Sequence, residues 1–492
     1  MARADLLRAL AGVAVSALAG CSFAPTLKVP EVPVAQSYKE EAPWTPAEPA
    51  DRIKRDAWWT QYGDKELDDL QGRLIAGSAD LAAALARYQQ AQAVSDQLHS
   101  GLFPTLAGIA SSERDRQSEA KPLRVLGPNS PNNYGQYNLG AQLDYEVDLW
   151  GRVRNQVASG NASARAAQAD LESARLSLQA QLADNYIVLR GLDRQIALLR
   201  DTVTAYEKAL DLTQARHAGG IASGLDVARA QTQIESARSQ LSQTLAQRAL
   251  TEHAIAALIG ESASSFALAP RTDELNLVRA PVGMPSTLLQ RRPDIAAAQR
   301  RVEAANANIG VTRAAFFPAI TLSAAAGFQS GQSSNWLKAP NSYWSIGPSL
   351  LLTLFDAGKR KAEVAQAQAA LDEQGASYRG VVLTAFQQVE DNLALLHHYA
   401  DADDADKAAV KAAQSAVDLS TSRYREGAVN YLDVVTAQTT ALQIQSEKLD
   451  LDTRQLRASV ALIRALGGGW SADAPVAEID TAAHARQGEL AR

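Results

Sequence analysis

The chain has 492 residues, of which 46% are hydrophobic and 21% are charged, and its formal net charge is −6. Its one cysteine excludes an internal disulfide framework and a zinc site built from several cysteines. The mild acidity argues against nucleic acid as a partner, because binding to phosphates needs clustered lysine and arginine. Proline is absent from residues 132–269 and 349–474. Since proline breaks helix interiors, these two spans indicate long helices.

The amino terminus predicts a secreted lipoprotein. Arg3 and Arg8 precede a short uncharged run, which is typical of a signal peptide and too short for a membrane span. The run ends in Leu18-Ala19-Gly20-Cys21, which resembles the lipobox of bacterial lipoproteins, in which the cysteine carries acyl chains. Several acyl chains on Cys21 would anchor the chain in membrane lipid, and by the same resemblance Ser22 favours the outer membrane. The alternative is that Cys21 is an ordinary buried apolar side chain.

The body of the chain contains a tandem duplication. Asp80-Leu81 and Phe103-Pro104 recur as Asp294-Ile295 and Phe317-Pro318, and the segment from Arg216 to Asp226 recurs as the segment from Arg423 to Asp433. Constant offsets of this kind identify a repeat. We therefore expect a signal peptide in residues 1–20, a lipid-anchored, proline-rich tether in 21–57, a first repeat in 58–260, a connection in 261–292, a second repeat in 293–470 and a disordered tail in 471–492.

Each repeat holds two segments with the periodicity of β-strands. From Tyr137 to Leu149 apolar and polar residues alternate, which predicts a strand with one apolar and one polar face. Its counterpart in the second repeat runs from Trp344 to Leu354, and the strand before that counterpart alternates from Ile320 to Gln329. The first strand of the first repeat, about Leu106–Ser118, alternates poorly.

Strands with one apolar and one polar face suit a membrane barrel with lipid outside and a polar lumen. Four strands per chain are too few to close a barrel, because known membrane barrels begin at about eight strands. Two copies would supply eight strands and three copies would supply twelve, and periodicity alone does not choose between these numbers. The alternative is that the strands form a soluble sandwich.

Each strand pair is embedded between helices. A helix of about Asp80–His99, and its counterpart Asp294–Ala314, precede the strands. Between Leu178 and Leu210 the large residues are spaced four and three apart, which predicts a coiled-coil seam with one polar intruder at Asn185. A helix from about Asn155 to Arg216 would be about 90 Å long. It must pack along a partner helix or another copy of the chain.

Several motifs resemble the outer-membrane efflux lipoproteins of the TolC-like superfamily, NodT subfamily. They are Trp58-Trp59 with Gly63-Asp64-Lys65-Glu66-Leu67, then Leu289-Gln290-Arg291-Arg292-Pro293-Asp294-Ile295, then Ala314-Ala315-Phe316-Phe317-Pro318, and finally Ala465-Leu466-Gly467-Gly468-Gly469-Trp470. The resemblance implies a mainly helical, tandem-duplicated fold that assembles as a homotrimer, with a twelve-stranded barrel in the outer membrane and long coiled-coil hairpins in the periplasm. It also implies a periplasmic adaptor and an inner-membrane RND-type pump as partners, and passive export of small molecules with neither catalysis nor a cofactor.

The same resemblance implies a periplasmic aperture closed in part by an aspartate after each helical turn. Matched by motif, these aspartates are Asp226 and Asp433. A second acidic residue often follows the latter by three positions, and here Thr436 stands in its place, which weakens any ring of charges. The alternative role for both aspartates is helix N-capping, and the two roles are compatible.

The run from His397 to Asp406 has the composition of a metal site. A calcium loop that starts at Asp401 would need glycine and glutamate where Asp406 and Ala412 stand. We therefore interpret the run as a solvated acidic helix face and expect no metal. The alternative to an export duct is a lipid-anchored periplasmic coiled-coil scaffold without a pore, which would have no use for a lipid-facing sheet.

Overall fold

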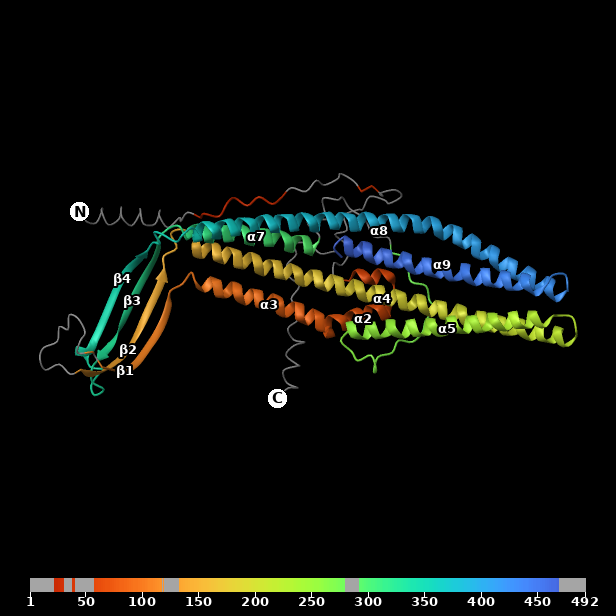
Figure 1. Ribbon diagram of the computed structural model, residues 1–492, viewed down its shortest axis with the longest axis horizontal. Coiled ribbons are helices and arrows are strands. Elements are labelled where there is room, and N and C mark those ends of the chain that lie inside the picture. The colour runs from red at the N-terminus through yellow and green to blue at the C-terminus, as the bar shows by residue number, and fades with distance from the viewer. Residues whose placement is uncertain are drawn as a thin grey trace. The chain divides into compact units, whose positions relative to one another are not determined.

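The computed structural model describes residues 22–30, 38–39, 57–116, 118, 132–278 and 292–468. The predicted signal peptide, Cys21, most of the predicted tether and the predicted tail lie outside these residues. The first half holds η2 (Trp58–Tyr62), α2 (Lys65–Gly77), α3 (Ala79–Ser100), β1 (Thr105–Arg116), β2 (Asn133–Glu146), α4 (Arg152–Ala218) and α5 (Gly224–Leu258) (Figure 1). The second half holds α7 (Pro293–Ala314), β3 (Ala319–Ser330), η4 (Ala339–Asn341), β4 (Ser342–Leu351), α8 (Lys359–Arg425) and α9 (Tyr431–Ala465).

From α3 and from α7 onward, the two halves repeat the same order of long helices and strands with matched helix lengths. Helices α3 and α7 both have 22 residues, α4 and α8 both have 67, and α5 and α9 both have 35. The tandem duplication predicted from the sequence offsets is therefore present in the fold. None of these helices, among the residues described, is long and apolar enough to cross a membrane.

The chain divides into two compact units. The first comprises residues 1–30, 89–167 and 298–378, and the second comprises residues 31–88, 168–297 and 379–492. Helices α4 and α8 contribute to both units. The halves of the duplication and the compact units are thus different divisions of the chain.

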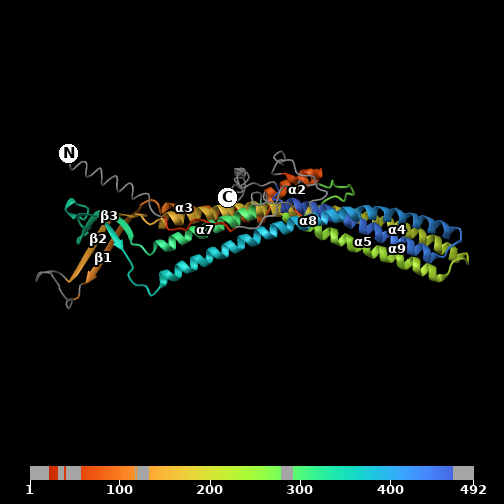
Figure 2. The same ribbon diagram turned by 90° about the horizontal axis from the view of Figure 1, so that it is seen from above.

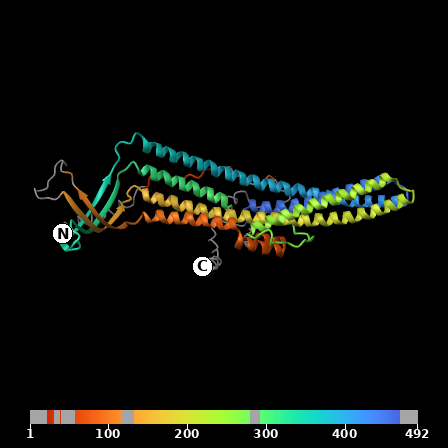
Figure 3. The ribbon, with the colours of Figure 1, turned by 60° about the horizontal axis from the view of Figure 1, so that its bottom comes forward.

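The first unit contains an antiparallel sheet with the strand order β1-β2-β3-β4 (Figure 3). The central pair, β2 and β3, joins the two halves of the duplication. Leu143 pairs with Ala324, which pairs with Ile346, so apolar residues share one face. One position along β2, Asp144 accepts a hydrogen bond from the hydroxyl of Ser323 at 2.7 Å on the other face. The predicted division into an apolar and a polar face is therefore confirmed for β2, β3 and β4.

The apolar face of this sheet is open in the single chain. Trp344 is 78% exposed, Ile346 66% and Leu350 65%. A row of large apolar side chains exposed together marks a surface made for lipid or for another protein. Strands β1 and β4 are the edges of the described sheet, so each has one neighbour there.

Two strands end earlier than the alternation predicts. Strand β2 ends at Glu146 because the carboxylate of Asp148 accepts the backbone N–H groups of Val153 and Arg154, at 3.2 and 2.9 Å, and so begins α4. Strand β4 ends at Leu351, which leaves the predicted strand residue Leu354 beyond the sheet and 88% exposed.

The second unit is built on the coiled-coil seam of α4. Leu182 and Leu189 are fully buried and Leu199 nearly so, in agreement with the predicted heptad spacing. Helix α2 packs its own apolar stripe, Leu67, Leu70 and Leu74, into the same core. Figure 2 shows the hairpins α4–α5 and α8–α9 of this unit lying side by side at their turns.

Candidate functional site

The turns of the two helical hairpins have the same backbone geometry. Gly220 and Gly427, which are equivalent in the duplication, adopt left-handed φ values of 73° and 79° that favour glycine. Three turn hydrogen bonds recur at equivalent positions: Gly219 N to Ala215 O and Glu426 N to Ser422 O, both 3.1 Å; Gly220 N to His217 O and Gly427 N to Tyr424 O, 2.9 and 3.1 Å; Ile221 N to Arg216 O and Ala428 N to Arg423 O, 2.9 and 2.8 Å. The helical tips are therefore two versions of one structure.

The two aspartates proposed from the sequence lie in the first turn of α5 and of α9, but neither is the N-cap. Ser223 caps α5, and Asn430 accepts the backbone N–H of Asp433 at 3.2 Å and caps α9. Asp226 completes a capping box, because its carboxylate accepts from the backbone N–H of Ser223 at 3.2 Å and from its hydroxyl at 2.8 Å.

The side chains of these two equivalent aspartates differ in their contacts. Asp226 also lies 3.6 Å from the guanidinium of Arg229. The carboxylate of Asp433 makes no hydrogen bond or ion pair with any residue that the structure describes. Asp433 is therefore a surface anion available for another contact, whereas Asp226 is engaged within its own helix.

Arg216, near the end of α4, links the two tips. Its Nη1 donates to the carbonyls of Tyr424 and Arg425 at 2.9 and 3.1 Å, and its guanidinium lies 4.7 Å from the centre of the Tyr424 ring. These carbonyls end α8, where helix carbonyls lack intrahelical partners and carry partial negative charge. Sequence reasoning identified Arg216 as part of the repeat, but nothing in the repeat indicated this contact.

Two tyrosines close the small core beneath this bridge. The rings of Tyr424 and Tyr431 lie 5.3 Å apart, and both side chains are buried beside Val434 and Ala230. Burial raises the pKa of Tyr431 to about 12, and the neighbouring Tyr424 adds to the rise. Tyr431 is therefore a neutral phenol at physiological pH.

The predicted acylation site, Cys21, lies outside the described residues, but the residues after it are held firmly on the first unit. Ser22 donates from its hydroxyl to Asn155 Oδ1 at 3.1 Å, and Asn306 donates to the carbonyl of Pro25 at 2.8 Å. The ring of Phe23 stacks on that of Phe317. The predicted tether thus begins with a segment that is docked on α4 and α7.

A buried charged network organises the second unit and was not anticipated from the sequence. The carboxylate of Asp193 is 1% exposed and accepts from Arg190 Nη1 at 2.7 Å and from Arg248 Nε at 2.6 Å. The same two arginines donate to the carbonyls of Ala269 and Leu268. The network therefore pins the connection between the repeats, which has no helix or strand of its own in residues 261–278, onto α4 and α5.

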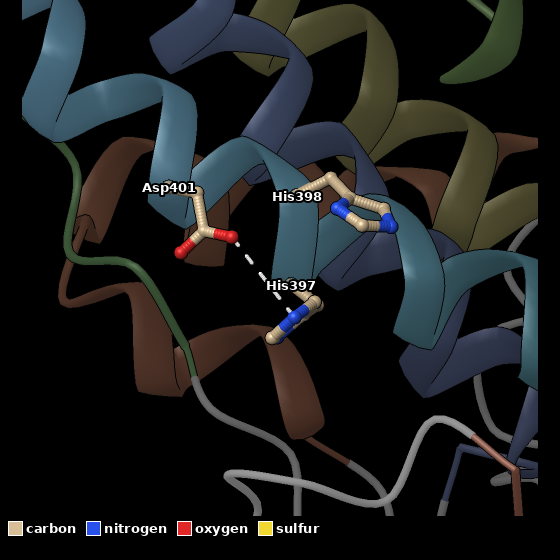
Figure 4. A group of neighbouring side chains, drawn as sticks. All are labelled: His397, His398 and Asp401. Carbon is tan, nitrogen blue, oxygen red and sulfur yellow. Dashed lines mark ion pairs between the residues drawn. The ribbon is translucent and has the colours of Figure 1, made fainter.

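The histidine-rich run lies wholly inside α8, so its acidic residues do not form a calcium loop. Figure 4 shows His397 turned toward Asp401, with Nε2 4.0 Å from Oδ2, and the ring of His398 lies edge-on to that of His397 with the ring centres 5.1 Å apart. The potential ligand atoms of these three side chains lie within 4.8 Å of one another, on half-exposed and exposed positions. The arrangement is one turn of an ordinary helix, and we assign no metal to it.

The same run is less solvated than the sequence interpretation expected. The carboxylate of Asp403 receives Lys448 of α9 at 2.8 Å as well as Lys407 of its own helix. Burial opposes ionisation of Asp403, but the hydrogen bonds from the two lysines outweigh it and lower its pKa. Part of the acidic face therefore joins α8 to α9.

Comparisons with known proteins agree with this arrangement. The sequence profile of the family described as "Outer membrane efflux protein" matches residues 70–261 and 284–468. The pyoverdine export outer membrane protein OpmQ of Pseudomonas aeruginosa is 34% identical over 418 residues, which span 85% of this chain and 88% of that protein. The toluene efflux pump outer membrane protein TtgC of Pseudomonas putida is 31% identical over 471 residues, spanning 94% of this chain and 96% of that protein. The solved outer-membrane channel OprN matches with a TM-score of 0.84 at 30% identity and covers 92% of this chain and 100% of its own.

Proposed function

Because the chain belongs to the outer membrane efflux protein family, we propose that it is the outer-membrane exit duct of a tripartite efflux pump, through which small molecules leave the cell passively. The duct has no catalytic residues in this proposal, and its partners are a periplasmic adaptor and an inner-membrane RND-type pump. Acylation of Cys21 anchors it in the lipid of the outer membrane.

The observation that carries the proposal is the open sheet of the first unit. Its large apolar side chains are exposed on one face, and its polar residues, such as Asp144, share the other. Since four antiparallel strands alternate in direction, β4 of one copy can pair antiparallel with β1 of the next. Three copies joined in this way make a closed twelve-stranded barrel in which no edge strand remains unpaired.

The alternative, a lipid-anchored scaffold without a pore, gives the apolar face of the sheet no role. Purified protein in a planar lipid bilayer separates the two functions. We expect step-like ion conductance from protein whose trimeric state has been confirmed by mass. Intact trimers that incorporate into the bilayer and never conduct would overturn the duct and favour the scaffold.

We also propose that Asp226 and Asp433 lie at the periplasmic aperture, at the turns of the helical hairpins. The different contacts of the two carboxylates allow the aperture role to be separated from helix capping. Asp433→Ala should raise single-channel conductance. It should leave thermal stability unchanged, because the carboxylate of Asp433 makes no hydrogen bond or ion pair with any described residue. Asp226→Ala should also cost about 1 kcal/mol through loss of the capping box. Unchanged conductance in both variants would leave the two residues without an aperture role.

The relatives are named for chemically unlike cargoes. A protein named for pyoverdine export and a protein named for toluene efflux are similar to this chain at 34% and 31% identity. We therefore propose that the inner-membrane pump, and not this duct, selects what is exported. Replacing the chain with either relative beside one pump should preserve the range of exported compounds, and a range that follows the duct would contradict this.

A further inference from the structure

The contact that Arg216 makes in the first repeat is missing at the equivalent position of the second repeat. Arg423 occupies the position in the duplication that Arg216 occupies in the first repeat, and the hydrogen bonds of the two turns match at equivalent positions. Arg216 binds the last carbonyls of α8, those of Tyr424 and Arg425. Arg423 is exposed, and its guanidinium has no hydrogen-bond or ion-pair partner in the part of the chain that the structure describes.

The duplication identifies the missing acceptors. The residues equivalent to Tyr424 and Arg425 are His217 and Ala218, at the end of α4. Their carbonyls end a helix in the same way and attract a cation for the same reason. Tyr424 is 4% exposed beneath Arg216, whereas His217 is an exposed side chain in the single chain. Within one chain the end of α8 faces Arg216, and the guanidinium of Arg423 makes no bond to the described end of α4.

We propose that Arg423 of each copy donates to the carbonyls of His217 and Ala218 of the next copy, so that the hairpin tips form one closed ring of arginine bridges. The inference rests on the proposed trimer, in which the two repeats alternate around the axis. Around the axis of such a trimer, the same rotation relates each repeat to the repeat that follows it. It carries the first repeat of one chain onto its second repeat, and it carries that second repeat onto the first repeat of the neighbouring chain. The bridge from Arg216 to α8 then becomes the bridge from Arg423 to the neighbouring α4, and the guanidinium of Arg423 lies over the ring of His217 as that of Arg216 lies over Tyr424.

Crosslinking tests the contact directly. The pair Arg423→Cys with Ala218→Cys is treated with a flexible bismaleimide about as long as an arginine side chain. We expect covalent dimers and trimers on a denaturing gel. The matched control, Arg216→Cys with Arg425→Cys, has the equivalent geometry inside one chain and should remain at the mass of the monomer with its thiols consumed. Protein with Cys21 as its one cysteine should give no crosslink.

The outcomes separate this inference from the proposed function. Suppose that the control pair reacts in native trimers while the cysteines at Arg423 and Ala218 stay uncrosslinked or are bridged within one chain. That result would overturn the proposed contact and would not affect the proposed function as an exit duct. Protein that is monomeric by mass in a membrane-like environment would overturn both. Bilayer conductance adds a second readout. Arg423→Ala removes the charge-assisted hydrogen bonds and should raise the ratio of open to closed tips by about tenfold. Arg423→Lys keeps a cationic donor and should restore most of the closed population.

Discussion

The ring of Phe23 lies 4.5 Å from the ring of Phe317, with an angle of 6° between their planes. Trp150 stacks on Phe317 at 4.9 Å, so three aromatic rings from distant parts of the sequence form one cluster. Trp150 lies just before α4 and Phe317 just before β3, where helices give way to strands. Phe23 follows the proposed acylation site by two residues, so the aromatic cluster fixes the segment next to that site on the first unit.

Phe23→Ala should free the amino-terminal segment from the first unit. Aromatic pairs contribute about 0.5–1.5 kcal/mol beyond the area they bury, and two of the ring pairs involve Phe23. We expect faster amide hydrogen exchange in residues 22–30 by mass spectrometry, with the rest of the unit unchanged. Leu27→Ala, which removes a 38% exposed side chain in the same segment, is the control. Equal exchange in the two variants would remove the cluster as the cause of docking.

Asp193→Ala should destabilise the second unit severely. Removing the carboxylate takes one of two anions from Arg190, whose side chain is 4% exposed and which keeps Glu66, and it leaves Arg248 with Glu252 alone. Each hydrogen bond lost between these charged groups costs about 1.5–3 kcal/mol. Thermal unfolding in detergent measures the loss. The control is Asp184→Ala, which breaks the more exposed pair with Arg457 and should cost about 0–1 kcal/mol. Similar melting temperatures for the two variants would mean that the buried network does not stabilise the fold.

Gly260→Ala should be far more harmful than Gly220→Ala. Both glycines have left-handed φ values, 77° and 73°, where alanine costs about 1–2 kcal/mol. A Cβ at Gly260 would also lie 2.0 Å from the carbonyl oxygen of Gly77, at the end of α2, whereas a Cβ at Gly220 meets nothing within 4 Å. Comparing the free energies of unfolding isolates the close approach of α2 and the end of α5. Equal losses would show that the backbone separates there without cost.

Tyr431→Phe should reduce the sensitivity of the protein to alkali. The pKa of Tyr431 rises from 10.0 to about 12 on folding, so the folded state keeps the proton that the unfolded chain loses. The stability contributed by the buried neutral phenol is complete below pH 10 and is lost as the pH rises to about 12. Chemical unfolding across this range should show a steeper loss for the parent protein than for the variant. Parallel curves would contradict the assignment.

The elements that the sequence predicts well are those specified by local periodicity. The heptads of α4 and the alternation of β2 depend on residues close together in the chain, so the pattern is legible without the fold. The sequence also contains the local features that specify α2, because Asp64 is its N-cap and Leu67, Leu70 and Leu74 form an apolar stripe at helical spacing.

The contacts of the candidate site were less predictable because they depend on tertiary partners. Asp226 and Asp433 stand in the same motif, but Ser223 has a hydroxyl that donates to Asp226, whereas the structure gives Asn430 no such bond to Asp433. Asp193 appears in the sequence as an ordinary helix carboxylate, and its value to the fold comes from Arg248 on another helix. The spacing of residues in the sequence gives their positions on a helix, but it does not identify the residues that they contact in the folded chain.

The matched helix lengths also restrict how this protein can change. Adding one residue to α4 alone would advance its end by about 1.5 Å and turn it by about 100°, which would carry the guanidinium of Arg216 away from the carbonyls of Tyr424 and Arg425. The same insertion in α8 would match the shift along the axis, but it would turn α8 about its own axis as well and would not bring the two faces back together. We therefore expect the long helices to change length by whole heptads, which bring a helix back to nearly the same face, and in both repeats together.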